Sequence, residues 1–169
     1  SYIYSMSVKK ITYLHGLESR QGGKKVDFLS SKGYVFAPKM GYKTNPNLFS
    51  EILEKLKKEG KPDLIIGSSM GGYFAYMLAS HFKDVEVILF NPALKERSVE
   101  FEGINKGEYK VKGTLALSEN DDVVIPSMTL KHLEEIDEIG NFSIEEMKDI
   151  GHQIPIHNFC NIYTKHHLK

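Results

Sequence analysis

Hydrophobic residues in this chain come in short bursts that polar segments separate. The first burst, Ile11-Thr12-Tyr13-Leu14, is β-prone and is followed at once by His15-Gly16, which predicts a buried strand that ends in a loop. The later bursts are also short runs of hydrophobic residues. Together they predict strands over residues 11–14, 34–37, 63–67, 85–90, 111–117 and 142–147.

Between these bursts, hydrophobic residues recur at helical spacing. The clearest segment begins at Asn45-Pro46, which predicts an N-cap with proline in the first turn, and it ends at Gly60. Its predicted apolar face consists of Leu48, Phe49, Ile52, Leu53 and Leu56. Shorter patterns predict helices over residues 24–32, with Gly33 as the C-terminal stop, and over residues 70–81, 126–136 and 154–166.

Strands and helices alternate along the chain, which is typical of the α/β class. We therefore expect a three-layer, doubly wound, mainly parallel six-stranded sheet with helices on both faces. The length of 169 residues, without a repeat, linker or low-complexity tract, predicts one domain over residues 1–169.

The composition argues against several function classes. The 22 Lys and Arg residues balance 22 Asp and Glu residues, whereas a nucleic-acid-binding protein normally has a basic excess. No apolar run approaches the roughly 18 residues that a membrane span needs, so we expect none. Cys160 is the single cysteine and cannot form an internal disulfide, which favours a reducing, cytoplasmic setting.

The sequence predicts neither a cofactor nor a metal. The histidines lack the H-E-x-x-H spacing of zinc enzymes, and one cysteine cannot build a thiolate zinc site. The glycine-rich nucleotide-binding motifs G-x-x-x-x-G-K-[ST] and G-x-G-x-x-G do not occur.

The most informative stretch is residues 67–72, Gly-Ser-Ser-Met-Gly-Gly, where a predicted strand gives way to a predicted helix. It fits G-x-S-x-G in one frame only, and in that frame Ser69 is the candidate nucleophile. A sharp turn between strand and helix would expose the serine, and glycines two residues away would avoid a collision across the turn. The alternative is a glycine-rich helix N-terminus that binds an anion.

A serine nucleophile needs a base and an orienting acid, and both follow later in the chain. Asp121 comes after the fifth predicted strand and His152 after the sixth. Because the carboxyl ends of parallel strands share one edge of the sheet, we expect these side chains to meet Ser69 there. Asp122 is the alternative acid, and we interpret His15 as structural.

Two backbone N–H groups are needed to bind the oxyanion of a tetrahedral intermediate. Met70, the residue after the nucleophile, supplies one of them by position. The other is expected from Leu17, in the loop after the first strand, where Gly16 permits a tight turn.

These motifs resemble those of the α/β-hydrolase superfamily, in particular a branch of small bacterial esterases without a lid domain. The resemblance runs from about Lys9 to the end of the chain and includes residues 13–16, 67–73, 91–93 and 151–152. It implies a minimal α/β-hydrolase core without a cap domain, and a serine hydrolase that cleaves carboxylic esters or thioesters through an acyl-enzyme. The nucleophile, acid and histidine of the family map onto Ser69, Asp121 and His152. Ser118 departs from the pattern, because these proteins often have glycine there.

The connection over residues 91–109, where this fold usually carries large caps, is short. We therefore expect an open site lined by Leu17, Met70 and residues near Pro92 and Leu94, and a small-molecule ester with a short acyl chain as substrate. An exposed ester on a larger molecule would fit as well. Alternative functions are a thioesterase or acyltransferase, and a non-catalytic protein-binding module on the same fold.

The net charge of zero hides an asymmetry along the chain. Residues 1–62 hold 12 Lys and Arg against 5 Asp and Glu, and residues 63–169 hold 10 against 17. With an expected strand order of second, first, third, fourth, fifth and sixth, the two halves lie on opposite sides of the sheet. The basic side would contain Lys24, Lys25, Lys55, Lys57 and Lys58, and the acidic side Glu134, Glu135, Glu138, Glu145 and Glu146.

We predict that this polarity causes weak head-to-tail self-association at low ionic strength, because complementary surface charges attract until salt screens them. Light scattering in low and high salt measures it. A monomer whose scattering does not change with salt would contradict the prediction.

Overall fold

The computed structural model describes residues 8–17 and 19–167. Its centre is a six-stranded sheet in the order β2-β1-β3-β4-β5-β6, and every neighbouring pair of strands is parallel. The predicted fold class and strand order are confirmed. The strands are β1 (Lys10–Leu14), β2 (Tyr34–Phe36), β3 (Leu64–Ser68), β4 (Glu86–Phe90), β5 (Lys112–Ser118) and β6 (Phe142–Met147).

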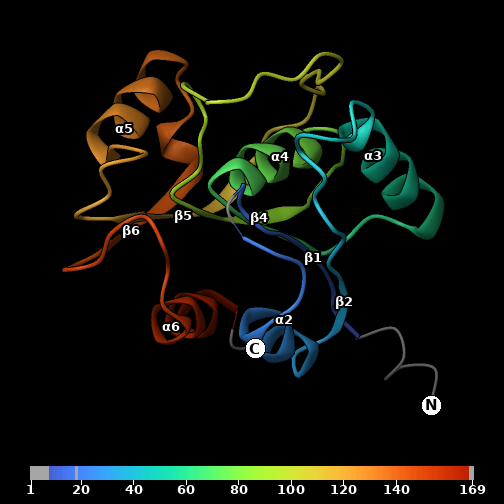
Figure 1. Ribbon diagram of the computed structural model, residues 1–169, viewed down its shortest axis with the longest axis horizontal. Coiled ribbons are helices and arrows are strands. Elements are labelled where there is room, and N and C mark those ends of the chain that lie inside the picture. Colours follow the sequence, from blue (N-terminus) through green and yellow to red (C-terminus); the bar gives the residue numbers. More distant parts are fainter. Residues whose placement is uncertain (1–7, 18, 168–169) are drawn as a thin grey trace.

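Helices cover both faces of the sheet, as Figure 1 shows. On one face lie α2 (Lys24–Ser30) and α6 (Ile156–His167), and on the other α3 (Leu48–Glu59), α4 (Met70–Ala79) and α5 (Pro126–Glu135). A short 3-10 helix, η1 (Ile139–Asn141), precedes β6 and was not predicted from the sequence. The crossovers between parallel strands thus form three layers.

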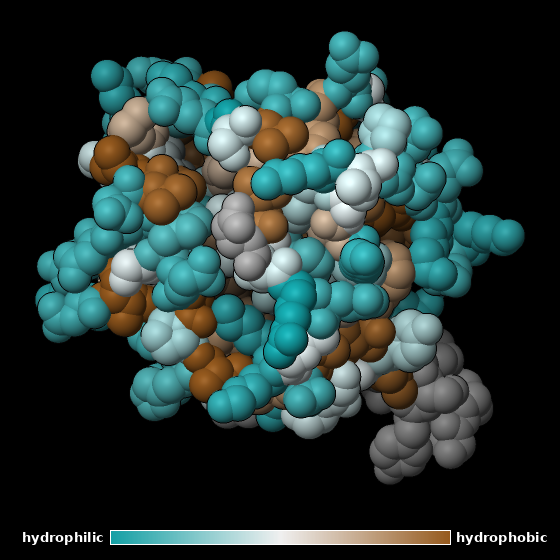
Figure 2. Space-filling model, in the orientation of Figure 1, coloured by the Kyte–Doolittle hydropathy of each residue, from teal (hydrophilic) through white to brown (hydrophobic). Residues whose placement is uncertain are grey.

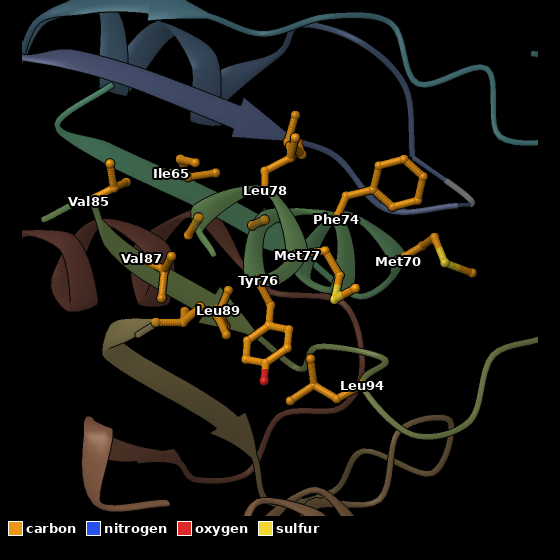
Figure 3. Packing of buried hydrophobic residues seen from close by; sticks show 14 of the residues in the cluster. Ile65, Met70, Phe74, Tyr76, Met77, Leu78, Val85, Val87, Leu89 and Leu94 are labelled. Atoms are coloured by element: carbon orange, nitrogen blue, oxygen red, sulfur yellow. The ribbon is translucent and has the colours of Figure 1, made fainter. Parts of the chain in front are cut away.

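The central strands are hydrophobic at nearly every position because both of their faces are buried. In β3, Leu64 and Ile66 pack in the core beneath α2 and α6, whereas Ile65 packs in the core on the α4 side. Figure 3 shows this second core, in which Ile65, Val87 and Leu89 of the sheet lie against α4. Sheet and α4 therefore form one rigid support for the loops at the carboxyl edge.

The predicted start of α3 is wrong by two residues. Asn47, not Asn45, is the N-cap. The Asn45 side chain instead accepts a hydrogen bond from the Asn47 N–H at 3.0 Å, so it closes a turn two residues ahead, and Pro46 lies in that turn rather than in the helix. Gly60 does end α3, with a φ of 96°.

Gly33 does not stop α2 in the way that the sequence suggested. The helix ends at Ser30 with Ser31 as its C-cap, and Gly33 lacks the positive φ of a glycine cap. A Cβ atom at Gly33 would lie 2.3 Å from the Lys9 carbonyl oxygen, so the close approach of two chain segments explains the glycine. Other boundaries differ from the predicted ones by at most two residues.

No helix within residues 8–17 and 19–167 is long and apolar enough to cross a membrane.

The connection between β4 and β5 contains no helix or strand and runs along the α4 side of the sheet. Val99, Phe101 and Ile104 pack onto the core on that side. The Phe101 and Phe74 rings are edge-on to each other, with 5.2 Å between their centroids. The first part of this connection forms one wall of the site described next.

Candidate active site

Ser69 lies at the turn between β3 and α4, in a backbone conformation that side chains rarely adopt. Its φ is 56° and its ψ is −115°. The Ser69 N–H donates to the Phe90 carbonyl oxygen at 2.9 Å, and the Ser69 carbonyl oxygen accepts from the N–H groups of Tyr73 and Ala93 at 3.1 and 3.0 Å. A strained conformation of this kind costs about 1–3 kcal/mol and persists because surrounding contacts hold it.

The glycines around Ser69 are required by close backbone contacts. A Cβ atom at Gly67 would lie 2.0 Å from the Gly71 carbonyl oxygen, and one at Gly71 would lie 2.1 Å from the Leu14 carbonyl oxygen. At Gly72 it would lie 2.8 Å from the Pro92 Cβ atom. Any side chain at these positions would push β1, β3, α4 and the segment after β4 apart. Crowding across the turn, the predicted reason for the glycines, is confirmed for Gly67, whereas Gly71 is required by its contact with the end of β1.

Three side chains from the ends of β3, β5 and β6 form one hydrogen-bonded row. The Nε2 atom of His152 lies 2.9 Å from the Ser69 Oγ, and its Nδ1 atom lies 2.8 Å from the Asp121 Oδ2. Because an ionised carboxylate only accepts hydrogen bonds, Nδ1 carries the proton in the neutral ring and Nε2 accepts from the serine hydroxyl. The structure therefore brings together Ser69, His152 and Asp121, as the sequence predicted.

The Asp121 carboxylate is held from two sides. Its side chain is completely buried, and Oδ1 accepts hydrogen bonds from the N–H groups of Val123 and Val124 at 2.9 and 2.8 Å. The other oxygen, Oδ2, thereby faces His152. Asp122, the alternative acid, is exposed, and the carboxylate that is hydrogen-bonded to His152 is that of Asp121.

His15 has a structural environment. Its Nδ1 donates to the Gly16 carbonyl oxygen at 2.9 Å, and its Nε2 accepts from the Met40 N–H at 3.1 Å. The Tyr42 hydroxyl donates to the His15 carbonyl oxygen, and burial raises the pKa of Tyr42, which keeps this hydroxyl protonated. These bonds hold the loop after β1 in place.

Leu17 and Met70, the predicted oxyanion donors, both line the cleft beside Ser69. Met70 is the first residue of α4, so its N–H has no acceptor within the helix. Neither N–H donates to another backbone group in the part of the chain that the structure describes. Gly16 brings the Leu17 loop close, because a Cβ atom there would lie 3.5 Å from the Ser69 Cβ.

The cleft at this edge of the sheet has a volume of about 660 Å³. Its walls come from the loop after β1, the start of α4, the segment after β4 and the turns that carry Asp121 and His152. The lining residues are Gly16, Leu17, Ser19, Ser68, Ser69, Met70, Ala93, Glu96, Arg97, Ser98, Val123, Val124, His152 and Gln153. Leu94 lines an adjoining hollow instead. No cluster of His, Cys, Asp or Glu suited to a metal ion occurs among residues 8–17 and 19–167.

Asn91 organises the site in a way that the sequence analysis missed. It is fully buried, with a φ of 44°, and its Nδ2 donates to the Ser118 Oγ at 2.8 Å and to the His152 carbonyl oxygen at 3.1 Å. Its Oδ1 accepts from the Ser118 N–H at 2.8 Å. One side chain thus joins the ends of β4 and β5 to the loop that carries His152. The Asn-Pro pair after the fourth strand was the only sequence signal, and the Ser118 hydroxyl, which a glycine would lack, accepts one of these bonds.

Arg97 was also missed, and it holds one wall of the cleft. Its guanidinium lies 3.8 Å from the centre of the Tyr73 ring, and Nη1 donates to the Ala93 and Leu94 carbonyl oxygens at 3.2 and 2.6 Å. These contacts fasten the segment after β4 to α4. Sequence spacing gave no reason to expect that an arginine in a polar connection would be partly buried against Tyr73.

Comparisons with known proteins agree with this architecture. The sequence model of UPF0227, described as an uncharacterised protein family, matches residues 10–141. No curated protein matches the sequence. Among solved structures, MGS-MChE2, an α/β hydrolase enzyme from a sediment metagenome of the lagoon of Mar Chica in Morocco, is 16% identical with a TM-score of 0.68, and the match covers 94% of this chain and 89% of that one.

Two further structures show the same arrangement. A monoacylglycerol lipase from Paleococcus ferrophilus is 17% identical with a TM-score of 0.64, and 86% of each chain is covered. A proposed hydrolase of the α/β superfamily from Xanthomonas campestris pv. campestris is 14% identical with a TM-score of 0.67, and the match covers 93% of this chain and 95% of that one. At these identities the similarity shows a shared α/β-hydrolase fold, as the motifs led us to expect.

We predict that Asn91→Ala lowers the free energy of unfolding by about 2–4 kcal/mol, because it removes two buried hydrogen bonds and one part-buried hydrogen bond and leaves the Ser118 hydroxyl without its donor. Urea denaturation measures the change. The control is Asn161→Ala at an exposed position of α6, for which we expect less than about 0.5 kcal/mol. Similar losses in both variants would contradict this account of Asn91.

Proposed function

The chain belongs to the uncharacterised protein family UPF0227, and we propose that it is a serine hydrolase that cleaves carboxylic esters. The observation that carries the proposal is the hydrogen-bonded row of Asp121, His152 and Ser69, which opens on the cleft. A strained serine, a histidine within hydrogen-bond reach and a buried carboxylate behind it are the parts that an acyl-transfer enzyme requires.

In the first step, the Ser69 Oγ attacks the carbonyl carbon of the ester. His152 Nε2 takes the hydroxyl proton as the new C–O bond forms, and the carbonyl oxygen becomes an oxyanion. The N–H groups of Leu17 and Met70 are proposed to donate to this oxyanion. Asp121 stays ionised, and it stabilises the imidazolium that His152 becomes.

In the second step, the bond between the carbonyl carbon and the leaving oxygen breaks. His152 Nε2 returns its proton to that oxygen, the alcohol departs, and the acyl group remains on Ser69. Water then enters. His152 takes a proton from the water as its oxygen attacks the acyl carbon, and the proton passes to the Ser69 Oγ when the carboxylic acid leaves.

The cleft in front of Ser69 is open. The connection between β4 and β5, where a cap would be inserted, carries no helix or strand, so no cap domain encloses the substrate. The serine therefore faces an open cleft, and we propose that a short acyl group sits beside Leu17 and Met70.

We predict that Ser69→Ala lowers kcat for p-nitrophenyl acetate by at least about 10³-fold, because the His152 ring bonds no other hydroxyl within residues 8–17 and 19–167. Stopped-flow absorbance follows both the burst of the acyl-enzyme and the steady state. Labelling by a fluorophosphonate probe should disappear in the same variant and persist in Ser68→Ala. Labelling of the Ser69→Ala protein would contradict the assignment of the nucleophile.

The two neighbouring aspartates allow a paired test of the acid. Asp121→Asn is expected to lower kcat by about 10³- to 10⁴-fold, because an amide no longer stabilises the imidazolium or selects the ring tautomer. Asp122→Asn, at an exposed position one residue away, should change kcat by less than about 2-fold. Equal effects of the two substitutions would overturn the role of Asp121.

A further inference from the structure

The candidate active-site cleft continues into a smaller hollow of about 70 Å³. This hollow, which we name the α5 trough, lies between residues 93–96 of the segment after β4 and residues 123–129 at the start of α5. Four residues line both spaces, namely Ala93, Glu96, Val123 and Val124. The α5 trough is thus an extension of the space in front of Ser69.

One wall of the α5 trough exposes large hydrophobic side chains. Val123, Ile125 and Met128 are 69%, 45% and 39% exposed. Eight large hydrophobic side chains are exposed in the described part of the chain, and three of the eight fall within six consecutive positions here. Figure 2 shows hydrophobic surface over the region of α5, at the upper left of the view. Such clustering beside a functional cleft marks a binding surface for an apolar group.

The other residues that line the α5 trough are also compatible with an apolar ligand. Leu94 and Thr129, which are both buried, also line it. The charged side chains at the rim, Lys95 and Glu96, are exposed and of opposite sign, so they favour neither an anion nor a cation. An aliphatic chain gains most from this surface, because each buried CH₂ group is removed from water.

The position of His152 decides which half of an ester the α5 trough receives. The leaving oxygen takes its proton from His152 Nε2, so the leaving alcohol lies on the His152 side of Ser69. The turn whose Asp121 holds the His152 ring also supplies Val123 and Val124 to the α5 trough. The proposed oxyanion donors, Leu17 and Met70, line the cleft but not the α5 trough.

We propose that the α5 trough binds the aliphatic chain of the alcohol in an ester whose acyl group is small. The inference rests on the proposed ester hydrolysis and adds the class of substrate, short-acyl esters of linear alcohols. The acyl group occupies the cleft beside Ser69, and the alcohol chain extends past Val123 toward Met128.

The test compares kcat/KM across a series of alkyl acetates from ethyl to hexyl. Hydrolysis is measured by pH-stat titration of the acid released. For the unmodified protein, kcat/KM is expected to rise by about 2- to 4-fold per CH₂ until the chain fills the α5 trough. The double variant Ile125→Asn/Met128→Gln should flatten this rise. It is expected to fold, because asparagine is a favoured N-cap residue at the position that Ile125 occupies, and glutamine is a good helix former.

The matched control is Ile136→Gln, at the other end of α5. Ile136 is 40% exposed, against 39% for Met128, but it does not line the α5 trough. The control should keep the chain-length dependence of the unmodified protein. Loss of the dependence in the control as well would show that general surface hydrophobicity, and not the α5 trough, selects the substrate.

A second series of p-nitrophenyl esters, from acetate to hexanoate, varies the acyl chain instead. If the double variant changes the dependence on acyl length and not on alcohol length, the α5 trough holds the acyl chain and the proposal is wrong. If the unmodified protein hydrolyses acetates without any dependence on the alcohol, this inference fails while the proposed function stands. If it hydrolyses no ester in either series, the proposed function fails and the inference falls with it.

Discussion

The reversal of the chain at Ser69 is the constraint on which the site depends. Between β3 and α4 the backbone turns within one residue, at a φ of 56° and a ψ of −115°. That turn is possible because Gly67, Gly71 and Gly72 let neighbouring segments approach to distances that a Cβ atom would forbid. The same contacts bring the loop after β1 and the segment after β4 against the start of α4. One local geometry thus assembles three walls of the cleft.

Opposite Ser69, a buried polar network brings the remaining groups to the same edge. Asn91 connects the ends of β4 and β5 with the loop of His152, and the N–H groups of Val123 and Val124 orient the Asp121 carboxylate. Buried groups of this kind are costly when unpaired, so a fully bonded network strongly favours one arrangement. The proposed catalytic row is therefore held by hydrogen bonds from Asn91 and from the backbone of Val123 and Val124.

The openness of the cleft and its extension along α5 follow from the same architecture. The connection after β4 is fastened to α4 by Arg97 and by packed hydrophobic residues, so it forms a wall and not a cap. The turn that positions Asp121 for His152 continues directly into the apolar start of α5. In the proposed reaction, chemistry and recognition of the leaving group are thereby coupled through one short segment, residues 121–128.

The sequence by itself determined the order and type of the strands and helices, because their patterns of hydrophobic residues are local properties of the chain. It also predicted Ser69, His152 and Asp121, with Asp122 as the alternative acid, since each follows a recognisable strand and parallel strands end at one edge. Only the tertiary structure decided that Asp121 and not Asp122 faces His152, that Asn91 and Ser118 are hydrogen-bonded, and that Arg97 packs on the Tyr73 ring. The start of α3 depended on a side-chain turn at Asn45. These features depend on contacts between distant segments or on side-chain hydrogen bonds, which local periodicity does not encode.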